Sequence, residues 1–98
     1  MQFTPFTIAV PDAAIDDLKV RLEGARWPAA TTTDFSHGTP VPFIQGLADY
    51  WRRDYDWRPH EARLNAHPQF LTEIDGQTIH FLHIKGKAKT NLPLLKVE

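Results

Sequence analysis

The sequence of 98 residues contains no cysteine, which excludes disulfide bonds, thiolate metal ligands and a cysteine nucleophile. This composition fits a reducing compartment, so we expect the cytoplasm. The sequence also lacks any run of about 18 consecutive apolar residues, and its first eleven residues have neither a basic start nor an unbroken apolar stretch. We therefore expect neither a transmembrane helix nor a signal peptide.

An excess of charge of one sign is missing as well. Eleven Lys and Arg residues stand against twelve Asp and Glu residues, for a net charge of -1. No basic field is available to attract phosphate backbones or anionic lipid. We expect no nucleic-acid partner and no membrane partner.

Apolar residues, in contrast, are plentiful. Hydrophobic residues make up 42% of the sequence and aromatic residues 11%, which argues against a disordered tail. A chain of this length is the size of one domain with one modest core. The composition predicts a globular domain over residues 1–98.

Periodic apolar residues predict helices in the first two thirds of the chain. Ile15, Leu18 and Leu22 recur on one helix face over residues 12–25, with Asp12 placed as the N-cap and Gly24 as the stop. Residues 29–41 predict a loop. A second helix is expected from Pro42 to about Arg53 and a third from about 56 to 65, where Asp56 is the expected N-cap. The helical part spans about residues 12–66.

Strand-forming residues follow the helices. Two runs rich in Ile, Leu and Phe flank Asp75-Gly76, a sequence typical of a type I′ turn, and predict a β-hairpin. Residues 92–97 predict a final strand, so that the strand part spans about residues 69–97. The expected fold class is α+β. A terminal strand without a covering helix leaves an unpaired edge and apolar faces, so we expect more of the sheet to follow.

Five histidines raise the question of a metal site. His80 and His83 are three apart on an expected strand and point to opposite faces, and no cysteine or suitably spaced carboxylate completes a tetrahedral set. His60 and Glu61 are adjacent, so they do not share one helix face as a base and its orienting partner. We expect these histidines to be hydrogen-bonded or solvent-exposed, and we expect no metal site.

Carboxylates and aromatic residues also have structural explanations. Asp12, Asp16 and Asp17 fall in the first turn of the expected helix, where negative charge stabilises the helix dipole. The aromatic run comprises Tyr50, Trp51, Tyr55 and Trp57. It resembles a stacking surface or ligand cage, but without excess positive charge we expect it in the core. No nucleophile elbow, phosphate-binding loop or zinc helix occurs. The residues alone therefore nominate no catalytic, cofactor-binding or metal site.

Several segments together resemble the N-terminal domain of epoxide hydrolases of the microsomal and juvenile-hormone type. They are residues 50–65 (YWRRDYDWRPHEARLN), residues 68–70 (PQF) and residues 75–83 (DGQTIHFLH), with supporting matches at residues 26–28 (RWP) and 92–95 (LPLL). The resemblance spans nearly the whole sequence.

The resemblance implies a fold and an activity. In that family this segment precedes an α/β-hydrolase domain, wraps around it and reaches its cap, and its hairpin and last strand open the catalytic sheet. The family reaction is attack of a carboxylate on an epoxide, giving an ester that water hydrolyses to a diol, without metal or organic cofactor.

The catalytic residues of the family lie farther along its sequence. Where the family continues into a His-Gly-Trp-Pro loop, this sequence has Lys96, Val97 and Glu98. The epoxide-polarising tyrosines also lie farther along, so Tyr50 and Tyr55 do not take that role. The resemblance therefore implies a truncation before the catalytic domain, no catalytic residue in this sequence and no activity of the chain alone.

Two functions are consistent with this sequence. The first is a structural or lid-supporting N-terminal domain of an epoxide hydrolase, with a catalytic α/β-hydrolase chain as its partner. The second is an independent interaction module that forms a homo-oligomer or docks on another chain through exposed strands and aromatic residues. The epoxide used by the complete enzyme is not fixed by this sequence.

Overall fold

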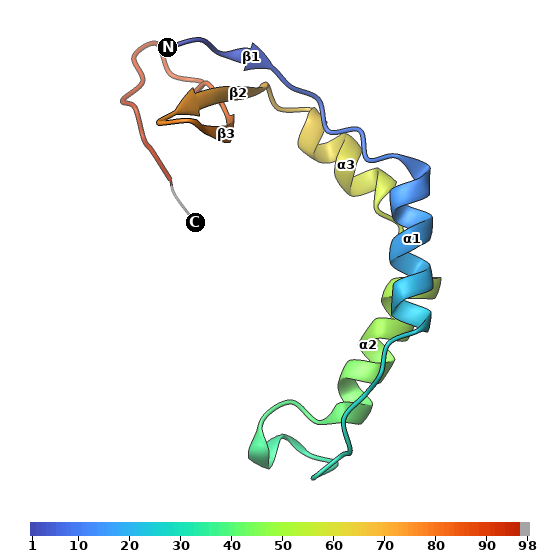
Figure 1. The fold of residues 1–98 in the computed structure, drawn as a ribbon. Helices are drawn as coiled ribbons and strands as arrows, with labels where there is room; N and C mark the ends of the chain where they lie inside the picture. The colour runs from blue at the N-terminus through green and yellow to red at the C-terminus, as the bar shows by residue number, and fades with distance from the viewer. Residues whose placement is uncertain (97–98) are drawn as a thin grey trace. The chain divides into compact units, whose positions relative to one another are not determined.

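The computed structural model describes residues 1–96 as a series of helices followed by a small antiparallel sheet (Figure 1). The chain divides into two compact units, one made of Met1–Ile8 with Glu61–Glu98 and the other of Ala9–His60. The elements in chain order are β1 (Thr4–Pro5), α1 (Asp12–Glu23), a short 3₁₀ turn (Phe35–His37), α2 (Val41–Arg53), α3 (Arg58–Asn65), β2 (Gln69–Ile74) and β3 (Gln77–Leu82).

The unit of residues 9–60 contains α1 and α2, which pack against each other. The apolar residues of α1 that recur on one face, Ile15, Leu18 and Leu22, are half-buried, as the spacing predicts. The N–H of Gly24 closes α1 by donating to the carbonyl of Val20. No helix described between residues 1 and 96 combines the length and apolarity needed to span a membrane.

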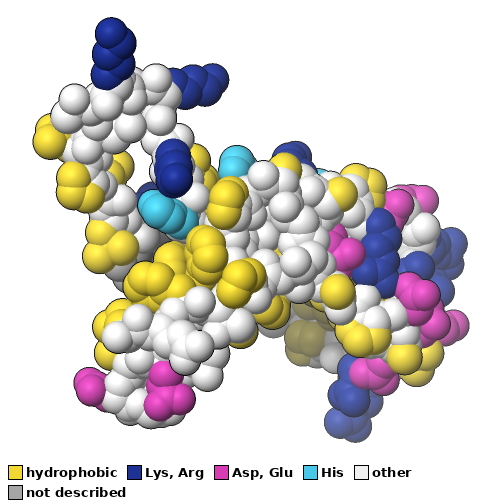
Figure 2. Space-filling view, turned by 90° about the horizontal axis from the view of Figure 1, so that it is seen from above, with side chains coloured by type: hydrophobic (Ala, Val, Ile, Leu, Met, Phe, Trp, Pro, Cys, Tyr) yellow, Lys and Arg dark blue, Asp and Glu magenta, His cyan; other side chains and the backbone are white. Residues whose placement is uncertain are grey.

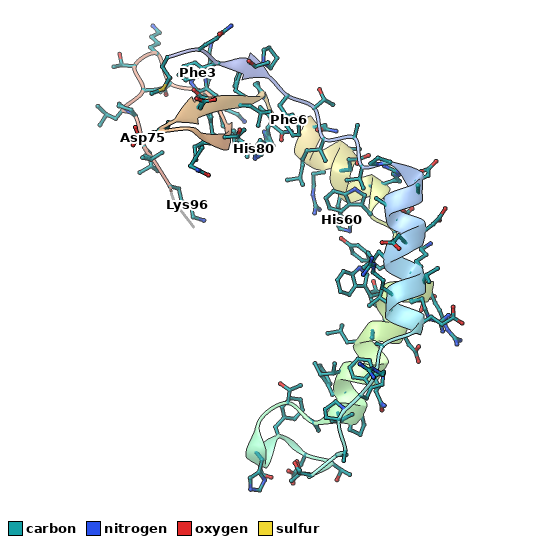
Figure 3. The ribbon with its side chains drawn as sticks, viewed as in Figure 1. Phe3, Phe6, His60, Asp75, His80 and Lys96 are labelled. Carbon is teal, nitrogen blue, oxygen red and sulfur yellow. The ribbon has the colours of Figure 1, made fainter. Side chains whose placement is uncertain are left out.

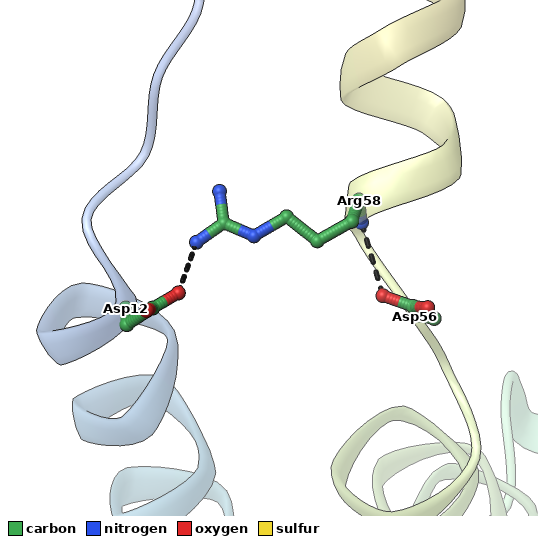
Figure 4. A network of polar contacts seen from close by, with 3 residues as sticks. All are labelled: Asp12, Asp56 and Arg58. Atoms are coloured by element: carbon green, nitrogen blue, oxygen red, sulfur yellow. Dashed lines mark hydrogen bonds and ion pairs between the residues drawn. The ribbon is translucent and has the colours of Figure 1, made fainter.

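The two expected N-caps have different outcomes. α1 begins at Asp12 itself, and its N-cap, Pro11, has no capping side chain, so the prediction for Asp12 was wrong. The Asp12 carboxylate instead accepts a hydrogen bond from Arg58 Nη2 at 2.6 Å. Asp56 does act as expected, because its Oδ1 accepts from the backbone N–H of Arg58 at the start of α3. Figure 4 shows both interactions.

The sheet has the order β1-β2-β3, with both neighbouring pairs antiparallel. The predicted hairpin is confirmed: β2 and β3 pair from Gln69 opposite Leu82 to Ile74 opposite Gln77. At the turn, Asp75 has φ 51° and Gly76 has φ 76°, as a type I′ turn requires. The α+β fold class is also confirmed by these helices and strands.

The two faces of this sheet differ in chemistry. One face carries a cluster of phenylalanine rings, with Phe81 5.3 Å from Phe3 and 5.6 Å from Phe70 between ring centroids. The other face carries Gln69 and His80, against which Phe6 packs edge-on at 5.4 Å from the His80 ring. Figure 3 labels Phe3, Phe6 and His80 around the hairpin. The alternation of strand side chains thus gives one apolar and one mixed face.

The expected final strand is not formed in the described residues. Residues 91–96 have no regular secondary structure, and Val97, the last residue of that prediction, lies outside the described residues. The third strand is instead β1, which pairs with β2 through Thr4 opposite Leu71 and Pro5 opposite Phe70. A strand needs a hydrogen-bonding neighbour in a sheet, and the described sheet consists of β1, β2 and β3 without residues 92–96.

The expected hydrophobic core is also absent from the described residues. None of their aliphatic or aromatic side chains is buried; the buried residues are Pro40 and two polar residues, Gln69 at 4% and Thr72 at 7% exposure. Figure 2 shows hydrophobic side chains, in yellow, on the surface that it draws. The physical reason is size, because each compact unit is about half of a chain that is itself small, and surface dominates volume at that scale.

The hairpin turn provides a test of its backbone geometry. We expect Gly76→Val to destabilise the chain by about 1–3 kcal/mol, because a β-branched side chain is strained at positive φ. The free energy of unfolding in urea measures the loss, and faster amide exchange in β2 and β3 locates it. The matched control is Gly46→Val in α2, where no atom lies within 4 Å of the added Cβ and helix propensity changes by less than about 0.5 kcal/mol. Equal effects of the two substitutions would contradict the turn assignment.

Candidate functional site

A shallow groove on α2 is lined by four large aliphatic or aromatic side chains. Its cavity of about 360 Å³ is lined by Leu47, Tyr50, Trp51 and Tyr55. We call this the aromatic groove. Leu47, Tyr50 and Trp51 share one helix face because they are separated by three and four residues. Tyr55 follows the end of α2, where its N–H donates to the carbonyl of Tyr50.

Ring contacts hold the lining of the aromatic groove in place. Tyr50 and Tyr55 meet at 6.5 Å with an interplanar angle of 60°. Tyr55 also stacks on His60 at 5.2 Å and 11°. Edge-on and offset-stacked rings attract one another beyond their area burial. The groove is therefore a defined surface with oriented rings.

The expectation that the aromatic run lies in a core was wrong for the described residues. Tyr50 is 53% exposed and Trp51 is 45% exposed, while Tyr55 and Trp57 are half-buried. The sequence signal was the high aromatic density between Tyr50 and Trp57. That density marks apolar surface that prefers burial, but it does not say whether the same chain covers it.

Charged residues lie in a second, larger cavity that shares Trp51 and Tyr55 with the aromatic groove. This cavity has a volume of about 550 Å³, and its lining also includes Asp12 and Arg58. The ion pair between Asp12 and Arg58 is partly or largely solvent-exposed, with side-chain exposures of 93% and 38% respectively. A pair in this setting contributes about 0–1 kcal/mol, so it orients Arg58 more than it stabilises the fold.

A polar network lies in the other unit, on the mixed face of the sheet. The buried amide of Gln69 donates from Nε2 to the carbonyl of Leu64 at 2.9 Å and to Asn65 Oδ1 at 3.1 Å. Its Oε1 pairs with His80 Nε2 at 2.8 Å. Asn65 in turn bonds both backbone groups of Ile8, at 2.8 and 2.9 Å. Sequence reasoning missed this network, because residues 57 apart carry no local signal that they meet.

Three of the histidines make contacts that the structure defines. His80 is hydrogen-bonded within the polar network, and His60 stacks on Tyr55. His83 follows β3, where its backbone N–H donates to the carbonyl of Pro68. Across residues 1–96, no three side chains of the types that ligate metals come together as a metal-binding group.

Asp34, Ser36 and His37 form a hydrogen-bonded chain in the 3₁₀ turn. Ser36 Oγ donates to Asp34 Oδ1 at 2.5 Å, and His37 Nδ1 lies 3.1 Å from the same Oγ. In a catalytic triad the imidazole takes the hydroxyl proton and the carboxylate orients the imidazole. Here the carboxylate binds the hydroxyl directly, so the arrangement caps the turn and does not activate a nucleophile.

Comparison with known proteins identifies the domain. The family described as "Epoxide hydrolase N terminus" matches residues 3–98. The chain belongs to the epoxide hydrolase N-terminus family. This confirms the resemblance found in residues 50–65 and 75–83, and it places the chain among proteins of the α/β-hydrolase fold.

Relatives of this epoxide hydrolase N-terminal domain come from bacteria and animals. The domain is 52% identical over 93 residues to a protein of Stigmatella aurantiaca described as "Putative epoxide hydrolase", covering 94% of this chain and 21% of that protein. It is 39% identical over 92 residues to juvenile hormone epoxide hydrolase 2 of Ctenocephalides felis, covering 93% of this chain and 20% of that protein.

Solved structures give the same result for the fold. The epoxide hydrolase of Aspergillus niger matches with a TM-score of 0.78 and 34% identity, covering 91% of this chain and 24% of that chain. The juvenile hormone epoxide hydrolase of Bombyx mori matches with a TM-score of 0.77 and 28% identity, covering 89% of this chain and 23% of that chain. The chain thus spans about a fifth of its curated relatives and about a quarter of the solved chains.

The Asp34 carboxylate offers a test of the turn in this domain. Hydrogen bonds from the Ser36 hydroxyl and then from the Ser36 backbone N–H lower the pKa of Asp34 below its ordinary value. We expect Ser36→Ala to raise the pKa of Asp34, as measured by NMR titration of its carboxyl carbon. Thr32→Ala is the matched control, since the Thr32 hydroxyl binds the Asp34 backbone carbonyl and not its carboxylate.

The lowered pKa of Asp34 determines how the stability of the turn changes with pH. The hydrogen-bonded carboxylate stabilises the turn above the pKa of Asp34 in the unfolded chain, and this contribution is lost as the pH falls through the lower folded value. Acid should therefore weaken the turn of the wild type by more than it weakens the turn of the Ser36→Ala variant, which has already lost the hydrogen bond from the hydroxyl. An unchanged Asp34 pKa in Ser36→Ala would contradict this hydrogen-bond assignment.

Proposed function

We propose that this chain is the N-terminal structural domain of an epoxide hydrolase and that it supports a catalytic α/β-hydrolase part and its lid. One observation carries the proposal: the described residues bury no aliphatic or aromatic side chain, yet both compact units present apolar surface. Such surface is typical of a domain that another protein layer covers. The relatives are about five times as long as this chain, and their additional residues are enough to form such a layer.

The support for a lid comes from the presence of an apolar surface on each of the two units. The sheet unit presents the phenylalanine cluster of Phe3, Phe70 and Phe81, and the helical unit presents the aromatic groove. A domain that contacts both the catalytic sheet and the lid needs two such surfaces. We propose the lid-supporting role on this basis, and the family resemblance supports it.

We also propose that the chain contributes no catalytic residue to epoxide hydrolysis. The family reaction requires a carboxylate nucleophile together with an activated water. The Asp34 carboxylate is already bound by a hydroxyl and a backbone N–H in an exposed turn, which reduces its nucleophilicity. The role left to this domain is mechanical support.

A chimera tests this function. The chain would replace the matched quarter of the Aspergillus niger epoxide hydrolase, and diol formation from styrene oxide would be measured for the chimera and for the chain alone. We expect diol formation by the chimera and none by the chain, since support and chemistry reside in different parts. The control is the same enzyme without any N-terminal domain, which should be unstable or inactive.

Two results would count against the function. Saturable diol formation by the chain alone would place catalytic groups within it. A chimera that is as inactive and as unstable as the control without an N-terminal domain would show that this chain does not support the catalytic part.

A second candidate function is an independent interaction module that pairs with a copy of itself. The observation that favours it is β3 (Gln77–Leu82), which contains no charged residue and no proline, and whose outer edge is unpaired within residues 1–96. Edge strands are normally protected by such residues, and an unprotected edge favours strand addition. Lys85, Lys87 and Lys89 follow the strand and oppose pairing by charge.

Sedimentation tests this second function. We expect an 11.2 kDa chain to sediment as a dimer at concentrations near 100 μM if β3 pairs with its copy. Thr78→Lys, which places a charge on the open strand, should restore the monomer, and Val20→Lys on α1 should leave the dimer intact. A wild-type monomer throughout that range would exclude this function and leave the first proposal standing.

A further inference from the structure

Residues 1–8, which include β1, lie along the edge of β2, and we call them the strap (Figure 1). Residues 1–7 are solvent-exposed, and β1 itself has only two residues, of which Pro5 has no N–H to donate. At the start of the strap, Thr72 Oγ1 donates to the carbonyl of Gln2 at 2.9 Å. A short and exposed edge strand has few contacts of its own. The attachment of the strap therefore depends on contacts outside the β1 ladder.

The polar contacts of the strap are made through its backbone. The side chain of Asn65 bonds the N–H of Ile8 at 2.9 Å and its carbonyl at 2.8 Å. The N–H of Phe6 donates to the carbonyl of Gln69 at 2.9 Å. Backbone groups are the same in every residue apart from proline, so these contacts recognise an extended main chain and not a sequence.

Two aromatic rings add contacts that do depend on the sequence of the strap. Phe3 meets Phe81 at 5.3 Å and Phe6 meets His80 at 5.4 Å between ring centroids, both edge-on. Phe81 and His80 are neighbours on β3, so their side chains point to opposite faces of the hairpin (Figure 3). An extended segment with aromatic residues three apart therefore has one ring for each face.

The directions of the hydrogen bonds in the polar network are fixed by the strap. The N–H of Ile8 only donates, so Asn65 Oδ1 accepts. Asn65 Oδ1 also accepts from Gln69 Nε2, which leaves Gln69 Oε1 to accept from His80 Nε2. Since the His80 ring contacts Phe6, the network begins and ends on the strap. Hydrogen bonds linked in this way support one another.

We propose that residues 1–8 are a detachable strap, latched by Asn65 and His80, over a site at the edge of β2 that binds an extended segment of the same sequence. The latch contacts both ends of the stretch from Phe6 to Ile8, so the strap is released as one unit. Release opens the β2 edge, where backbone groups and two ring positions receive an extended segment with aromatic residues three apart. While it is attached, the strap occupies this site at an effective concentration of roughly millimolar.

Amide hydrogen exchange of the 98-residue chain, resolved by NMR, tests the latch. In Asn65→Ala we expect the amides of Phe6 and Ile8 to exchange about tenfold or more faster, and by the same factor, because the strap opens as one unit. The amide of Phe6 is the decisive reporter, since it is bonded to Gln69 and not to residue 65. The matched control is Asn91→Ala, which removes an exposed amide that bonds two backbone carbonyls outside the strap.

Peptide binding tests the site under the strap. A labelled synthetic peptide of residues 1–10 would be titrated against the wild-type chain and against the double variant Phe3→Ser with Phe6→Ser, which weakens the strap and leaves the β2 edge unchanged. Fluorescence anisotropy should show saturable binding to the double variant and at least about tenfold weaker binding to the wild type, because the intact strap competes within its own chain. A peptide that carries the same two serines should not bind.

Each of three results would overturn the proposal. If Asn65→Ala accelerates exchange at Ile8 alone, the contacts act separately and there is no latch. If it accelerates the amides of β2 and β3 as much as that of Phe6, the strap does not detach by itself. If the double variant loses protection throughout the hairpin, or keeps it and fails to bind the peptide of residues 1–10, the β2 edge is not a separate binding site.

Discussion

The side chain of Asn65 holds the first segment of the chain in the position on which the sheet unit depends. It bonds both the N–H and the carbonyl of Ile8, in the manner of a neighbouring strand. This explains how β1 is held although it is only two residues long, since two hydrogen bonds of about 1 kcal/mol each extend its attachment. With the segment fixed, Phe3 and Phe6 fall on opposite faces of the sheet. Gln69 joins the same network, and its burial makes an unsatisfied amide costly, by about 1–3 kcal/mol.

The two compact units use their apolar residues in different ways. In the sheet unit, Phe3, Phe70 and Phe81 cluster on one face and leave that face without a covering layer in the described residues. In the helical unit, α1 and α2 pack against each other, while Leu47 and Tyr50 of the aromatic groove remain exposed. Among residues 1–96, neither unit buries an aliphatic or aromatic side chain, so both leave apolar surface without a covering layer. The solved family members are about four times as long as this chain.

The sequence correctly predicted the elements that depend on interactions between residues close together in the chain. The Asp75-Gly76 turn was predicted because positive φ at two consecutive residues favours Asp and Gly. The helices were predicted from apolar spacing to within a few residues. The predictions that failed required knowledge of distant partners. Residues 92–96 have strand-forming side chains but form no strand in the described sheet, and Asp12 pairs with Arg58, 46 residues away, in place of capping α1. The aromatic groove was visible in the sequence only as aromatic density, because the sequence does not state which layer covers a helix face.

The open edge of β3 and the aromatic groove place different demands on a partner. Strand addition at β3 uses backbone hydrogen bonds, which any extended segment supplies, so the edge by itself discriminates poorly. The groove requires a surface of matching shape without charge, and a mismatched partner would leave a void or bury a charge against Trp51 and Tyr55. A partner that contacts the groove would therefore be selected by its shape, whereas strand pairing at β3 would add affinity without selecting a sequence.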